Sequence, residues 1–103
     1  MAKFVLLYHG GATPADDEEM AAAMARWEAW FASLGDAVVD WGSPFGRSTT
    51  VSGATTIDGG VSALTGYSII TAESLSAATE AAQACPVLVI GGSVEVYEAT
   101  PIG

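Results

Sequence analysis

His9 is the residue best suited to chemistry, because it is the only histidine in the chain and stands directly before Gly10 and Gly11. An imidazole changes its charge near neutral pH and can act as a general acid or base. The glycines leave the backbone free to approach a ligand. A catalytic histidine needs a carboxylate that orients its ring, and Glu95 and Asp40 are the candidates. The alternative is a structural histidine with a hydrogen bond at the edge of the core.

Trp41 and Tyr67 are the aromatic residues that we expect to line an apolar pocket for a small molecule, with a polar group at its mouth. Burial in the core explains both aromatic residues at least as well. Glu95 lies in an apolar strand, so its carboxylate must either point to solvent or find a partner. We take His9 and Glu95 as candidate catalytic residues, and Trp41 and Tyr67 as candidate substrate-binding residues.

The remaining acidic, glycine and cysteine residues are better explained by structural roles than by catalysis or ligand binding. The acidic run 16–19 suits the positive end of a helix dipole, and adjacent helical acids do not converge on a metal ion. The glycine pairs lack the patterns of phosphate-binding loops. Cys85 is the single cysteine and lies on the apolar face of a predicted helix, which indicates a small core residue. The sequence therefore implies no metal ion and no cofactor.

The charge balance makes several partners unfavourable. Three Lys and Arg against twelve Asp and Glu give a formal net charge of −9, which is the wrong sign for nucleic acid or an anionic membrane. We find neither a secretory signal nor an apolar run near the ~20 residues that cross a bilayer. We therefore expect a cytoplasmic protein, and the length of the chain suits one domain.

Hydrophobic patterns predict four principal strands. These runs are rich in β-branched and aromatic residues and lie at 4–8, 37–41, 67–71 and 94–97. Gly42 is expected to end the second strand. A polar, Thr-rich stretch at 47–57 is expected to form an accessory hairpin, followed by a turn at 58–60.

Two helices are predicted between these strands. The first starts at Thr13 and Pro14, and Gly35 ends it. Its apolar face consists of Met20, Met24, Trp27, Phe31 and Leu34. The second is capped by Ser74 and stops at Cys85, before Pro86. Its narrower apolar face consists of Leu75, Ala78, Ala82 and Cys85.

Two β-α-β halves, at 3–41 and 66–98, follow one another, which is the split arrangement of an α+β ferredoxin-like sandwich. Such a fold has an antiparallel sheet with two helices on one face. In the strand order 4-1-3-2, the four candidate site residues meet at one end of the sheet. An error of one residue in register moves a side chain to the other face, so the face of each stays open.

The predicted sheet leaves one apolar face uncovered. The first strand, FVLLY, is apolar on both faces, yet two helices cover only one face of such a sheet. A symmetric homodimer whose sheets face each other covers the second face and encloses a pocket on each side.

Four segments across nearly the whole chain match one known family: KFVLLYHGG, WEAWFASLG, LTGYSIITAESLSAATEAAQACP and GGSVEVYEATPI. They resemble the YCII-related family, also called the DGPF-domain family, within the dimeric α+β barrel superfamily. The resemblance implies that residues 1–103 form one YCII-related, ferredoxin-like domain of a dimeric barrel. The chain has DGGVSA where many relatives have DGPFAETKE, and Tyr97 where an arginine often stands. These departures argue against a basic anion-binding group.

Three functional hypotheses follow. The first is a YCII-like homodimer that binds a small organic ligand in a pocket at the His9 end of the sheet. The second is an enzyme that uses His9, oriented by Glu95, as general acid/base on a small cyclic or lactone-type substrate, by analogy with lactone isomerases and dehalogenases of the superfamily. The third is a protein-interaction module.

Overall fold

The computed structural model describes residues 1–102, which form a four-stranded sheet, a two-stranded sheet and two α-helices. The strands of the larger sheet are β1 (Ala2–His9), β2 (Val38–Pro44), β5 (Leu64–Ala72) and β6 (Ser93–Ala99). The helices are α1 (Asp17–Leu34) and α2 (Leu75–Ala82), and single 3-10 turns follow them at Gly35–Ala37 and Pro86–Leu88. The smaller sheet is a hairpin of β3 (Thr49–Ser52) and β4 (Thr55–Asp58).

The larger sheet has the order β2-β5-β1-β6, and every neighbouring pair is antiparallel. This is the order predicted for a ferredoxin-like fold, and all four principal strands are longer than predicted. β1 is central, and Leu7 lies opposite both Tyr67 of β5 and Glu95 of β6. The register therefore fixes which residues of the three strands share a face.

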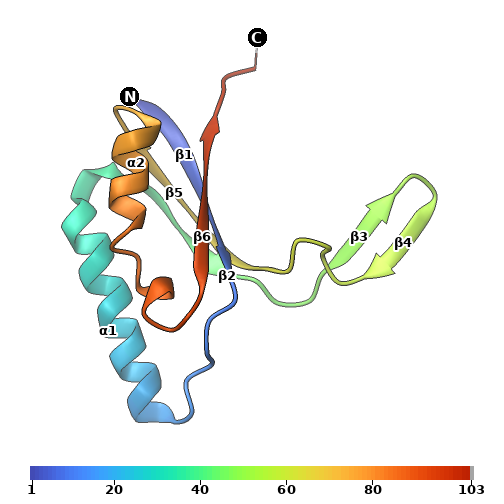
Figure 1. Ribbon diagram of the computed structural model, residues 1–103, viewed down its shortest axis with the longest axis horizontal. Coiled ribbons are helices and arrows are strands. Elements are labelled where there is room, and N and C mark those ends of the chain that lie inside the picture. The colour runs from blue at the N-terminus through green and yellow to red at the C-terminus, as the bar shows by residue number, and fades with distance from the viewer. Residues whose placement is uncertain (103) are drawn as a thin grey trace.

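Both helices cover the same face of this sheet, as Figure 1 shows. Alternate residues of β1 are buried beneath them, namely Phe4, Leu6 and Tyr8. Trp30 and Phe31 of α1 complete this core from the other side, together with small side chains of α2. The opposite face carries the intervening residues of β1, and neither α1 nor α2 covers it. We call it the open face.

The predicted start of α1 at Thr13 and Pro14 is wrong by several residues. Asp16 is the N-cap, and its carboxylate accepts a hydrogen bond of 2.8 Å from the backbone N–H of Glu19. A side-chain acceptor in this position satisfies an amide that the helix leaves unpaired. The prediction that Met20 and Met24 belong to the core is also wrong, since both are about half exposed. The first turns of α1 extend beyond the end of the sheet (Figure 1).

The second helix ends at Ala82 rather than Cys85. Pro86 disfavours helical geometry in the residue before it, and Cys85 has extended dihedral angles of φ −65° and ψ 133°. Cys85 is nevertheless buried as predicted, and this burial raises the pKa of its thiol to about 11. Leu75, expected on the apolar face, is half exposed.

The accessory hairpin is confirmed as β3–β4, and it extends away from the helices (Figure 1). Gly53 at its tip has a φ of 61°, as the first residue of a type II′ turn requires. Val51 and Ile57 are exposed to 68% and 53%. The hairpin thus has no apolar core of its own.

Candidate functional site

The structure brings the four predicted site residues to one end of the sheet but divides them between its faces. Tyr8 and Ser68 are buried beneath the helices, so the neighbouring side chains of His9 and Tyr67 point to the open face. Glu95 also belongs to the open face, through its pairing with Leu7. Trp41 instead lies on the helix side. The register thus settles the face of each residue, which the sequence left open.

Irregular pairing of β2 explains the position of Trp41. The register between β2 and β5 shifts twice, before and after Asp40, and such bulges re-aim the side chains that follow. Gly42 does not end the strand as predicted. It has a φ of 81°, and a Cβ there would stand 1.7 Å from the carbonyl oxygen of Tyr67. Only glycine permits this approach, which allows Trp41 to stack on Phe31 of α1 with ring centroids 4.6 Å apart.

A pocket of about 320 Å³ lies between α1 and the adjoining ends of β2 and β5. Tyr67 also borders it, but the Tyr67 side chain points to the open face, where its hydroxyl donates a hydrogen bond to Asp40. Most of the wall is aromatic or aliphatic and includes Tyr8, Met24, Trp27, Phe31, Trp41 and Pro44. The pocket has the size and the apolar character of a site for a small molecule.

Two buried hydroxyl groups belong to the pocket wall. Tyr8 Oη donates to Ser68 Oγ over 2.7 Å, and Ser68 Oγ donates to the carbonyl oxygen of Trp41 over 2.7 Å. Ser68 is only 1% exposed. Burial raises the pKa of the Tyr8 phenol, which therefore remains protonated and neutral. The chain of bonds fixes both hydroxyls in place.

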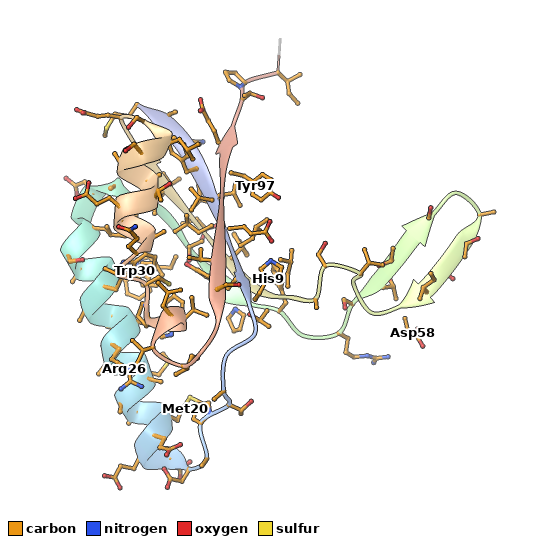
Figure 2. The ribbon with its side chains drawn as sticks, viewed as in Figure 1. His9, Met20, Arg26, Trp30, Asp58 and Tyr97 are labelled. Atoms are coloured by element: carbon orange, nitrogen blue, oxygen red, sulfur yellow. The ribbon has the colours of Figure 1, made fainter. Side chains whose placement is uncertain are left out.

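A second polar group, formed by His9, Glu95 and Tyr97, lies on the open face. Nε2 of His9 contacts Oε2 of Glu95, and the Tyr97 hydroxyl donates to Oε1 of Glu95 over 2.8 Å. Figure 2 shows His9 and Tyr97 on the side of the sheet away from Trp30 and the helices. Hydrogen bonds from Tyr97 and then His9 lower the pKa of Glu95, and the same carboxylate raises the pKa of Tyr97.

This arrangement leaves one nitrogen of His9 free for chemistry. A carboxylate only accepts, so Nε2 carries the hydrogen of the contact and Nδ1 has the lone pair in the neutral ring. Two acids, Glu95 and Asp40, were candidate partners of His9. Glu95 makes the contact, whereas Asp40 accepts a hydrogen bond from Tyr67. Neither His9 nor Glu95 lines the aromatic pocket. Their side chains are 25% and 45% exposed, so solvent reaches this pair.

Three residues of these two groups, Tyr8, Ser68 and Tyr97, were not among the site residues predicted from the sequence. Ser68 had a usable signal, because a hydroxyl within an apolar strand needs a partner when buried. Tyr97 had one as well, since it is two residues from Glu95 and must share its face. Tyr8 had no such signal, because it is the last residue of an apolar strand and its presence there is explained by burial.

Comparisons with known proteins assign no family. The chain matches no protein-family model, and no curated protein is similar enough to count as a match. The YCII-related family therefore stays a prediction. Within residues 1–102, no helix is long and apolar enough to cross a membrane. The same residues contain no group of three or more His, Cys, Asp or Glu that could hold a metal ion.

Replacing Tyr97 with phenylalanine tests the coupling around Glu95. Tyr97→Phe removes the main hydrogen bond that lowers the Glu95 pKa, so we expect that pKa to rise towards its ordinary value of 4.5. Because the Glu95 pKa is lower in the folded protein than in the unfolded chain, the ionised carboxylate stabilises the fold above pH 4.5. This stability is lost as the pH falls through the Glu95 pKa of the folded protein. The variant should therefore lose less stability on acidification.

The measurement is a ¹³C NMR titration of the glutamate carboxyl groups. Tyr67→Phe is the matched control, because it removes a tyrosine hydroxyl that bonds Asp40 rather than Glu95. An identical titration of Glu95 in wild type and Tyr97→Phe would contradict the coupling.

Proposed function

We propose that this protein binds a small, largely apolar molecule in the pocket between α1 and β2, and that it does so as a YCII-related homodimer. The pocket is the observation that carries the proposal. Its volume of about 320 Å³ lies at the lower end of the ~300–1,000 Å³ typical of ligand sites. A one- or two-ring aromatic compound suits such a space.

The exposure of the wall residues supports binding over simple packing. Trp41 is 57% exposed although one side of its ring stacks on Phe31. Met24 is similarly exposed on the opposite wall. A planar ligand between them removes this apolar surface from water, which is favourable by about 25 cal/mol per Å². The buried hydroxyls of Tyr8 and Ser68 provide a polar contact that orients it.

Removing the Trp41 ring tests the pocket. We expect 2-naphthol to bind wild-type protein saturably and Trp41→Leu at least about tenfold more weakly, since the stacking surface is lost. Amide chemical shifts in ¹H–¹⁵N NMR spectra give both the affinity and the residues affected.

Tyr97→Leu is the matched control, because it removes an aromatic ring from the other face of the sheet. Equal affinity of wild type and Trp41→Leu, or shifts confined to residues outside the pocket, would refute this use of the pocket.

The open face supports the homodimer. Val5, Leu7 and Ile69 alternate with the buried residues of β1 and β5, and no helix covers them in the protomer. The carboxylate of Glu95 on this face is hydrogen-bonded by His9 and Tyr97. A second copy of a chain with net charge −9 meets least repulsion on a surface of this kind.

A charge at the centre of the open face tests the homodimer. We expect sedimentation equilibrium to give the mass of a dimer for wild type and at least about tenfold weaker association for Leu7→Glu, because the new carboxylate must be desolvated. Leu75→Glu adds the same charge at a half-exposed position on α2 and should associate normally. A monomeric wild type would contradict the proposal.

A second candidate function is proton transfer by His9. The contact with Glu95, which Tyr97 also bonds, favours it because an oriented imidazole with a free Nδ1 is a general base. Pairing of two open faces would enclose His9 in a cleft and exclude water from it. The likeness to lactone-processing proteins suggests a small cyclic substrate with an acidic C–H group.

The probe for this activity is α-angelica lactone in D₂O, with deuterium incorporation followed by ¹H NMR. We expect wild type to exceed the buffer rate, His9→Asn to return to it, and Glu95→Gln to lose about 10²-fold, since the base is no longer oriented. Glu98→Gln, on the same strand but the other face, should keep the full rate. A wild-type rate equal to that of buffer would rule out this chemistry for the lactone.

A further inference from the structure

We infer that the aromatic pocket selects ligands that carry a positive charge, as an arylalkylammonium ion does. This inference rests on the proposed function, because it names the ligand class of the same pocket. Three features support it: the distribution of charge around the pocket, its aromatic faces, and the direction of the hydrogen bonds in its wall.

No basic side chain reaches the pocket. The chain has only three Lys and Arg residues, Lys3, Arg26 and Arg47, and none of them lines it. The one charged residue in the wall is Glu28. An anionic ligand would therefore find no counter-charge, in a protein whose net charge of −9 already repels it.

Glu28 is available to a ligand. Among residues 1–102 the only ion pair is His9–Glu95, and no side-chain hydrogen bond engages the Glu28 carboxylate. Met24 precedes Glu28 by four residues and Phe31 follows it by three, so all three lie on one face of α1. The carboxylate thus borders the apolar wall, where a ligand with an apolar ring places a charged substituent.

The aromatic rings add attraction for a cation. Trp41 stacks on Phe31 with an interplanar angle of 19°, and its other face is open. Trp27 stands edge-on to Tyr8, with ring centroids 5.1 Å apart. The negative faces of tryptophan rings are the strongest protein partners for organic cations. A cationic ligand therefore gains from the wall an attraction that a neutral one lacks.

The buried hydroxyls accept hydrogen bonds but do not donate them to a ligand. The Tyr8 proton is used by Ser68, and the Ser68 proton is used by the Trp41 carbonyl. Only oxygen lone pairs remain at this part of the wall. An ammonium or hydroxyl group can donate a hydrogen bond to these oxygens, whereas a carboxylate has no proton to offer.

Three probes on one ring system test the inference: 2-naphthylmethylammonium, 2-naphthylmethanol and 2-naphthoate. At neutral pH and low salt we expect the ammonium ion to bind wild type about tenfold more tightly than the alcohol, and the carboxylate to bind most weakly. Glu28→Gln should abolish much of the ammonium preference and leave the affinity for the alcohol unchanged. Added salt should narrow the preference, because the charges lie at the pocket rim.

Glu18→Gln is the control, since it removes an exposed carboxylate of α1 that does not line the pocket. If the alcohol binds and the ammonium ion binds no more tightly, or if Glu28→Gln keeps the full preference, the inference is wrong and the pocket function stands. If none of the three probes binds, both the proposed function and the inference fail.

Discussion

The alternation of side chains along β1 is the constraint on which the rest of the structure depends. β1 is paired on both edges, and Phe4, Leu6 and Tyr8 point beneath the helices. Its other side chains must therefore point to the open face. Tyr8 and His9 are neighbours in sequence but lie on opposite sides of the sheet. The aromatic pocket and the His9–Glu95 pair are thereby separate sites, and each can be altered without touching the other.

The sequence predicted the topology well because the topology follows from local signals. Strands and helices alternate as two β-α-β units, and few chain paths join such units in one sheet. This path brought two acids, Glu95 and Asp40, within reach of His9, and only the structure shows that Glu95 is the one in contact. Element ends were less predictable. Asp16 and Thr13 are both good N-caps by type, and only the contact with Glu19 distinguishes them.

The candidate site was predicted only in part, because the face of each strand depends on register. The two shifts in β2 and the close approach at Gly42 bring Trp41 to the helix side, and periodicity contains no sign of either. Met20 and Met24 have helical spacing, but the first turns of α1 extend beyond the end of the sheet and both side chains stay about half exposed. A hydrophobic pattern indicates that a surface is favourably buried. It does not indicate whether that surface packs against protein or against a ligand.

The β3–β4 hairpin is less stable than the rest of the fold. An isolated pair of strands is at best marginally stable, and this pair has no apolar layer on either side. Its amide hydrogens therefore exchange through local opening, at a free energy far below that of global unfolding. Its tip projects away from the larger sheet and the helices (Figure 1). Proteases will cut there first, and evolution can lengthen or shorten the arm at little cost to the fold.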